Sequence, residues 1–164
     1  MESGGERAYD RGIALADEAI ATDPGVADAY YALFLNVGRK SERSGMGSQA
    51  LSVARLKELL RKTLALDSRH AHAWEAQGEM LMRLPWLLGG SDEEGKRALR
   101  RAAELAPNWA KPQLRLAQFD FEHGRKARAH AEAEIARDLA EAAGDDDYRA
   151  EAEALLRKID ESER

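Results

Sequence analysis

Apolar residues recur every three to four positions along most of this chain, which is the spacing of an amphipathic helix. Short segments rich in Gly, Pro, Ser or Asp interrupt the pattern and separate eight predicted helices. Their approximate limits are 5–22, 25–38, 48–66, 69–84, 91–106, 109–123, 126–143 and 146–160. The pattern therefore predicts an all-α protein.

Residues at the predicted boundaries support these limits. Ser91 is followed three residues later by Glu94, which is a capping box at a helix start. Asn108 is placed to cap the next helix. Gly124 and Gly144 are each placed to end a helix in a left-handed conformation. These capping residues predict short, well-defined connections between the helices.

Three helix ends in the chain resemble one another, at residues 19–24, 63–68 and 102–107. A new helical segment follows each of them, so the unit that repeats is a pair of helices. Successive ends are separated by roughly 40 residues, which is in the range of helical tandem repeats. The chain is thus predicted to be a stack of helix pairs.

Small residues occur in these helices at positions where closely packed helices must meet. Trp74 is followed four residues later by Gly78, and Ala129 and Ala133 share the packed face of a later helix. Through these residues the chain resembles the tetratricopeptide repeat superfamily over roughly residues 5–143. The resemblance implies an α-solenoid of about eight helices that ends in a C-terminal capping helix.

The repeat spacing predicts a single domain over residues 1–164. Its parts are a half repeat or N-terminal cap (5–24), a repeat with a long insertion (25–68), a repeat with a short insertion (69–107), a repeat (108–143), and a capping helix with its tail (144–164). The first part resembles only the second helix of a unit. It is therefore either a cap or the start of a chain that continues upstream.

The first helices of tetratricopeptide units line a concave groove that accepts a peptide or a helix, and the resemblance implies such a groove here. The residues that it places there are Asp28, Tyr31, Leu35, Arg39, His72, Glu75, Glu79, Met82, Arg83, Lys111, Leu114, Arg115, Gln118 and Phe121. Both signs of charge and several apolar groups occur among them, as in a mixed recognition surface.

One subclass of this superfamily clamps the C-terminal carboxylate of chaperones with Lys and Asn side chains. Lys111 and Arg115 match the last members of that clamp, but Tyr31, Leu35 and Ala76 stand where its other members are needed. Binding of chaperone tails is therefore not expected. Lys111 and Arg115 are still candidates for binding another acidic group.

The short insertion contains an apolar run in a predicted loop, Trp86, Leu87 and Leu88. These side chains either fold back over the stack, or form a contact patch or the rim of a pocket. The insertions also resemble those of bacterial tetratricopeptide proteins associated with TRAP transporters. That resemblance implies a component of a transport system.

Composition argues against several classes of function. The net charge is −5, with 25 basic and 30 acidic side chains, so no basic excess favours nucleic-acid binding. The chain has no cysteine, which excludes thiolate metal sites and cysteine nucleophiles.

The sequence motifs argue against further classes of site. His70 and His72 lack a third ligand at helical spacing, so no metal site is expected. No nucleophile and base pair or phosphate loop stands out either. Neither a cofactor nor an enzymatic activity is expected, and no apolar run has the length of a membrane span.

These observations favour a non-catalytic scaffold that binds a peptide or helix of a partner protein in the concave groove. A second hypothesis is a component of a transport system that binds a small or apolar ligand, as a monomer or an oligomer. A third is a non-catalytic segment of a larger regulator or enzyme. We expect a cytoplasmic location, or a periplasmic one if the chain continues upstream of Met1. The partner and the oligomeric state are left open.

Overall fold

The computed structural model describes residues 4–41 and 46–162, with side chains for residues 7–41 and 52–162. Within these ranges the chain forms eight α-helices, one short 3-10 helix and no strand. The elements are α1 (Gly4–Thr22), α2 (Ala27–Ser41), α3 (Met46–Leu66), α4 (Ala71–Arg83), η1 (Trp86–Leu88), α5 (Asp92–Leu105), α6 (Ala110–Glu122), α7 (Lys126–Ala143) and α8 (Asp146–Glu161). The all-α prediction is confirmed, and each predicted helix is present with limits that differ by a few residues.

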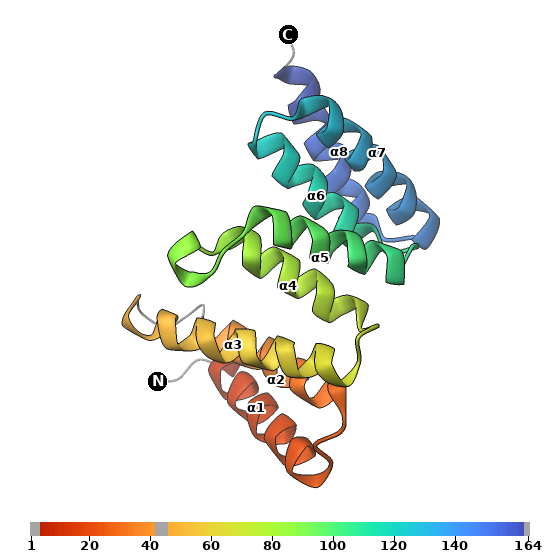
Figure 1. Ribbon diagram of the computed structural model, residues 1–164. Coiled ribbons are helices and arrows are strands. Elements are labelled where there is room, and N and C mark those ends of the chain that lie inside the picture. Colours follow the sequence, from red (N-terminus) through yellow and green to blue (C-terminus); the bar gives the residue numbers. More distant parts are fainter. Residues whose placement is uncertain (1–3, 42–45, 163–164) are drawn as a thin grey trace.

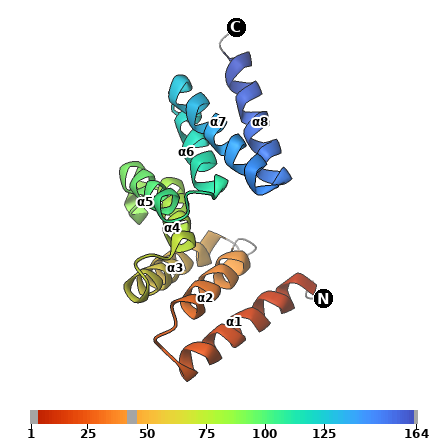
Figure 2. The same cartoon turned by 90° about the vertical axis from the view of Figure 1, so that its right-hand side faces the viewer.

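The helices stack in chain order from α1 to α8 (Figure 1). Neighbouring helices form the main contacts: α1 packs on α2, α4 on α5, α6 on α7, and α7 on α8. Viewed from the side, the stack is bent, with α1 and α8 displaced to one side and α5 to the other (Figure 2). This is the predicted α-solenoid, in which each unit contacts mainly its neighbours.

Small residues allow the helices to pack closely. A methyl group added at Gly78 would lie 2.7 Å from Leu99 and 2.9 Å from the carbonyl oxygen of Gly95, so α4 and α5 approach closely there. In the C-terminal half, alanines of α7 pack without exposed surface between α6 and α8. That core consists of Leu114, Ala117, Ala129, Ala133, Ala136, Ala152, Leu155, Leu156 and Ile159.

The predicted helix ends agree with the structure, apart from one cap. The Ser91 hydroxyl oxygen accepts a hydrogen bond from the backbone N–H of Glu94. Gly124 and Gly144 have positive φ angles of 73° and 68°, as the left-handed caps require. Asn108, however, does not cap α6: the helix starts one residue later than predicted, and Trp109 precedes it without a side-chain cap.

No helix in the described ranges is both long and apolar enough to cross a bilayer. Buried side chains are instead distributed along one face of each helix, against the next helix of the stack. The opposite faces of α2, α4 and α6 are only partly covered, and the candidate site lies there.

Candidate recognition groove

A hollow of about 420 Å³ opens where α2, α3, α4 and α6 meet, and we call it the recognition groove. It brings together eight of the residues that the sequence predicts for a concave surface. They are Tyr31, Leu35, Arg39, Glu75, Glu79, Arg83, Lys111 and Arg115. The other lining residues are Phe34, Gly38, Ser41, Leu56, Ala76 and Met80.

The floor of the groove is apolar. Tyr31 and Phe34 lie one turn apart on α2, and their rings stack with centroids 5.9 Å apart. Leu35, on the same face of the helix, is exposed, while Leu56 of α3 and Met80 of α4 complete the floor. Such a surface can accept a large apolar side chain from another molecule.

One end of the groove contains a network of ion pairs between α4, α6 and α8. The Glu75 side chain is only 2% exposed, and its Oε1 lies 2.8 Å from Lys111 Nζ. Arg115 Nε lies 2.6 Å from Glu79 Oε1, and its Nη1 lies 3.5 Å from an oxygen of Glu151. Three carboxylates and two cations thus largely neutralise one another at this end.

Burial shifts the pKa values of the side chains at this end of the groove. It raises the pKa of Glu75, and the nearby Glu79 raises it further, whereas Lys111 opposes both effects. Burial and then the same two carboxylates raise the pKa of Tyr31 to about 12. The Tyr31 hydroxyl therefore keeps its proton at neutral pH and can donate a hydrogen bond to a ligand.

The opposite end of the groove is cationic. Arg39 and Arg83 line it, and both side chains are exposed. Arg83 forms no ion pair within the part of the chain that the structure describes. By contrast, Lys111 and Arg115, the cations expected to bind an acidic group, already bind Glu75 and Glu79. Of the lining cations, we therefore assign the attraction for an acidic ligand to Arg83.

Three residues predicted for the groove lie elsewhere, and the reason is helix packing. Leu114 is wholly buried in the C-terminal core, and Phe121 packs against the same core. Met82 points at α5, since a methyl group added at Gly95 would lie 2.4 Å from Met82 Cγ. These three positions belong to the packed faces of α4 and α6, which the prediction treated as open.

Three further predicted residues lie outside the lining of the groove. Asp28 Oδ1 is 3.0 Å from His70 Nε2, and the other ring nitrogen of His70 accepts from the backbone N–H of Ala73. The ring of His72 meets Trp109 edge-on at 4.4 Å. Each side chain thus joins neighbouring units.

Gln118 is the third, and its Oε1 accepts a hydrogen bond from Arg115 Nη1. It therefore supports the ion-pair network from outside the groove. Among the described residues, no three His, Asp or Glu side chains are grouped so that they could hold a metal ion.

Phe34, Leu56 and Met80 were missed by the sequence analysis. Phe34 lies one helical turn from the predicted residue Tyr31, and that spacing was the signal that could have found it. Leu56 belongs to a second helix, and the resemblance implied only first helices in the groove. Its contribution depends on how α3 meets α4, which the sequence pattern does not specify.

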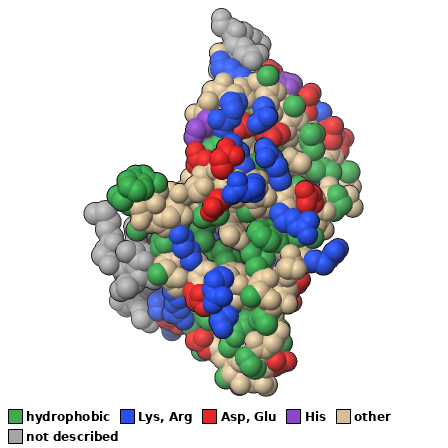
Figure 3. All heavy atoms as spheres, viewed as in Figure 1, with side chains coloured by type: hydrophobic (Ala, Val, Ile, Leu, Met, Phe, Trp, Pro, Cys, Tyr) green, Lys and Arg blue, Asp and Glu red, His purple; other side chains and the backbone are tan. Residues whose placement is uncertain are grey.

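The residues of η1, which we call the Trp86–Leu88 turn, do not fold back over the stack. Trp86, Leu87 and Leu88 are 79%, 74% and 43% exposed. Figure 3 shows an apolar cluster at the left edge of the molecule, at the place where Figure 1 draws η1. Of the alternatives from the sequence, folding back over the stack disagrees with these exposures, and a role as a contact patch or pocket rim stays a prediction.

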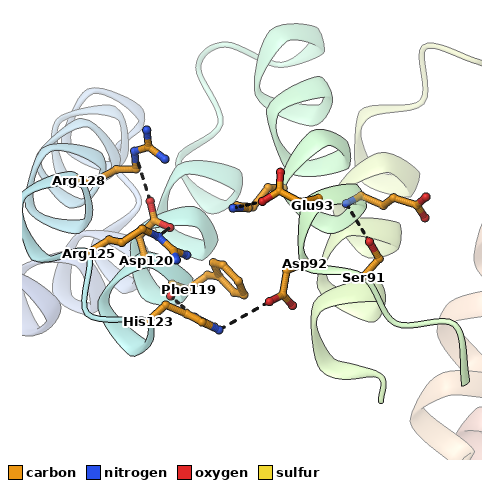
Figure 4. Close-up of polar contacts among 10 residues, drawn as sticks. Ser91, Asp92, Glu93, Phe119, Asp120, His123, Arg125 and Arg128 are labelled. Carbon is orange, nitrogen blue, oxygen red and sulfur yellow. Dashed lines mark hydrogen bonds and ion pairs between the residues drawn. The ribbon is translucent and has the colours of Figure 1, made fainter. Parts of the chain in front are cut away.

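A second polar cluster connects α6 to α7 (Figure 4). Asp120 is buried, and its carboxylate lies 2.7 Å from Arg125 Nε and 3.6 Å from Arg128 Nε. Burial, and then the charge of Asp120, raises the pKa of the nearby Glu132 to about 7. Because Asp120 is already satisfied by two arginines, we interpret this cluster as structural.

The same view shows how α5 meets α6. The ring of His123 stacks on Phe119 at 3.9 Å, and His123 Nε2 lies 3.7 Å from a carboxylate oxygen of Asp92. Lys96 is paired with Glu93 at 2.7 Å and lies over the Phe119 ring. The contacts of His123 with Asp92 and of Lys96 with Phe119 thus connect α5 to α6.

Comparison with known proteins supports the fold. No family model and no curated protein sequence matches the chain. Two crystal structures of MamA are similar to it, each at 18% sequence identity. The first covers 99% of this chain and 96% of that chain with a TM-score of 0.58. The second covers 94% and 82% with a TM-score of 0.56. At this identity the likeness shows a shared all-helical solenoid fold.

Proposed function

We propose that this protein is a non-catalytic scaffold whose recognition groove binds a short segment of a partner protein. The observation that carries the proposal is the composition of the groove, which joins an open apolar floor to a cationic end across successive units. Surfaces of this kind bind peptides by burying one or two anchor side chains and by pairing charges at the rim.

The groove indicates which segment it would bind. Tyr31, Phe34 and Leu56 suit a large apolar side chain, and Arg83 suits a carboxylate beside it. Lys111 and Arg115 already pair with Glu75 and Glu79, so they add little attraction. The expected ligand is therefore a segment with an aromatic or leucine residue and an acidic residue a few positions away.

The affinity is expected to be modest. Burying one large apolar side chain contributes about 2–3 kcal/mol, and an exposed ion pair adds up to about 1 kcal/mol. Backbone contacts along the groove would add to this, but ordering of the peptide opposes them. We therefore expect a dissociation constant in roughly the micromolar range or weaker.

Selection from a phage-displayed random peptide library tests the proposal. The selected peptides should combine Trp, Phe or Leu with nearby Asp or Glu. A labelled peptide measured by fluorescence anisotropy should bind about tenfold or more weakly to Leu35→Glu and to Arg83→Glu. The matched controls Ile135→Glu and Arg157→Glu change exposed residues outside the groove lining and should bind normally.

The proposal fails if the selected peptides lack this pattern. It also fails if the two groove variants bind the peptide as well as the two controls do. Binding that weakens equally in all four variants would indicate a general effect of charge, not recognition in the groove.

A further inference from the structure

We propose that a second copy of this chain supplies a segment for the recognition groove, so that two copies exchange their Trp86–Leu88 turns reciprocally. This inference rests on the proposed function, because it uses the same groove. Three independent features of the turn support it: its exposure and fixed shape, the charges that follow it, and its position beside the groove.

The turn presents apolar side chains in a fixed shape. The backbone N–H groups of Leu88 and Gly90 both donate to the Pro85 carbonyl oxygen. Lys57 of α3 donates to the carbonyl oxygens of Leu88 and Gly89. A segment that is already ordered loses little conformational entropy on binding, so its exposed Trp and Leu side chains are suited to act as anchors.

Close packing at the end of the turn also indicates that the turn has a fixed shape. A methyl group added at Gly90 would lie 1.8 Å from the carbonyl oxygen of Leu84, so only glycine fits there. Ser91 then donates its backbone N–H to the Leu81 carbonyl oxygen. The connection between α4 and α5 is thus closed tightly while its apolar side chains face water.

The charges that follow the turn complement the groove. Asp92, Glu93 and Glu94 begin α5 directly after it. They face His123, Lys96 and Arg97 respectively, yet all three side chains stay more than half exposed and so can still meet a cation of another molecule. The segment 86–94 therefore combines apolar anchors with acidic residues a few positions later. That is the chemistry expected of a ligand for the apolar floor and for Arg83.

The turn and the groove lie side by side on one molecule. Arg83 lines the groove and Trp86 follows it by three residues at the end of α4 (Figure 1). On the other side, Leu56 lines the groove and the adjacent Lys57 binds the turn. A projection beside a matching hollow allows a two-fold arrangement in which each copy gives and receives the same contact. A closed dimer is therefore expected.

Other occupants of the exposed turn fit the surroundings less well. An anionic lipid surface would repel the acidic start of α5. A different protein with its own apolar pocket would not need the groove beside the turn. Both are outcomes that the experiments below distinguish from self-association.

Sedimentation velocity from about 10 µM to about 1 mM protein is the first test, since weak dimers populate in that range. The wild-type chain should form dimers as the concentration rises. The double variant Trp86→Ala/Leu87→Ala should dimerise about tenfold or more weakly, and so should Leu35→Glu. Leu35 is 44% exposed and the control residue Ile135 is 46% exposed. Ile135→Glu should dimerise like the wild type.

Mixing the variants tests whether the turn enters the groove. The Trp86→Ala/Leu87→Ala chain retains its groove, and the Leu35→Glu chain retains its turn. A mixed pair can therefore restore one of the two reciprocal contacts. Mixed dimers should form more readily than dimers of either variant alone, yet more weakly than wild-type dimers.

Several results would overturn the inference. One is a wild-type chain that stays monomeric up to about 1 mM. Another is a dimer that survives the Trp86→Ala/Leu87→Ala changes, and a third is a mixture of variants that forms no mixed dimer. A monomer that sediments with phosphatidylcholine and phosphatidylserine vesicles only when Trp86 is intact would assign the turn to membranes instead.

Failure of the inference is distinguishable from failure of the proposed function. The Trp86→Ala/Leu87→Ala chain keeps every lining residue of the groove. If it binds the selected peptide while the wild type never dimerises, the scaffold function stands and the self-association is wrong. If neither peptide nor second copy binds, both proposals fail.

Discussion

At the scale of single residues, the least expected feature is Glu75, a buried carboxylate at one end of the groove. Its pKa is raised by burial, and Lys111 is the cation that opposes this effect. A buried ion pair of this kind adds little net stability compared with an apolar pair, but the loss of one partner is costly. The folded protein therefore depends on Lys111 mainly through Glu75.

Lys111→Met should lower the free energy of unfolding by about 2–3 kcal/mol, because Glu75 is left buried beside Glu79. A carboxyl with a raised pKa holds its proton longer in the folded state, so stability falls as pH rises above the pKa of the unfolded chain. The loss should therefore be larger at pH 8 than at pH 5. Urea unfolding at both pH values measures it.

The double variant Glu75→Gln/Lys111→Met should recover most of that loss, because no unpaired charge stays buried. Lys158→Met, which changes an exposed lysine on α8, should have almost no effect. Equal losses in the single and double variants would show that the Lys111 chain contributes through packing and not through charge.

Glu132→Gln should remove a pH dependence of stability. The pKa of Glu132 is raised from 4.5 to about 7 in the folded protein, so its ionisation costs stability as pH rises from about 4.5 to about 7. Because the residue is only half buried, we expect a gain of about 1 kcal/mol for Glu132→Gln at pH 8 and none at pH 4. Thermal unfolding across this range measures it, with the exposed Glu122→Gln as the control. A gain at pH 4 equal to that at pH 8 would contradict the assignment.

The residues of the groove could be named from the sequence more readily than their contacts. Glu75, Glu79, Lys111 and Arg115 were all predicted for one surface, and the structure brings them together there. Their mutual neutralisation could not be predicted, because it depends on the distance between α4 and α6. Leu114 was misplaced for a related reason, since one residue turns a helix by about 100° and moves a side chain from an open face to a packed one.

At the scale of elements, the α4–α5 pair shows how close packing limits substitution. Alanine at Gly78 would place a methyl group 2.7 Å from Leu99 and 2.9 Å from a backbone oxygen. Gly38, also within a helix, has its nearest such neighbour at 3.8 Å. The two glycines therefore have the same helical context but different space around them.

Gly78→Ala should destabilise the protein by about 1–3 kcal/mol, because overpacking outweighs the better helix propensity of alanine. Gly38→Ala should instead stabilise it by up to about 1 kcal/mol, since only the propensity changes. Urea unfolding of both variants tests the contrast. A stabilised Gly78→Ala protein would show that α4 and α5 separate easily.

Helix positions and most caps were predictable because they depend on local patterns, as with Ser91 and Gly144. The exposure of the Trp86–Leu88 turn could not be predicted from the sequence. A run of three apolar residues gives the same sequence pattern whether its side chains cover the stack or face water. Its exposure results from how Lys57, distant in sequence, holds the turn.

At the scale of the whole molecule, the described helices contact mainly their neighbours, and their buried side chains form several separate clusters. The C-terminal core of α6, α7 and α8 is separate from the cluster that joins α1, α2 and α3. In such an arrangement stability is a sum of local terms, and a change at one end is felt mainly by the adjacent units.

Ile159→Ala should therefore destabilise one end of the molecule selectively. The side chain is wholly buried between α8 and its neighbours, and its truncation should cost about 2–4 kcal/mol locally. Amide hydrogen exchange should become faster in α6, α7 and α8 and change little in α1 and α2. Uniform acceleration along the chain would show that the stack unfolds as one cooperative unit.

The exposed indole of Trp86 also provides an intrinsic fluorescence probe of the turn. The chain contains three tryptophans. Trp74 donates its ring N–H to the Ser68 carbonyl oxygen, and Trp109 packs against His72, so both already have fixed surroundings. An indole in water emits fluorescence at longer wavelength than a buried one. Any molecule that covers the turn should therefore shift the emission to shorter wavelength, and an unlabelled sample is enough to see it.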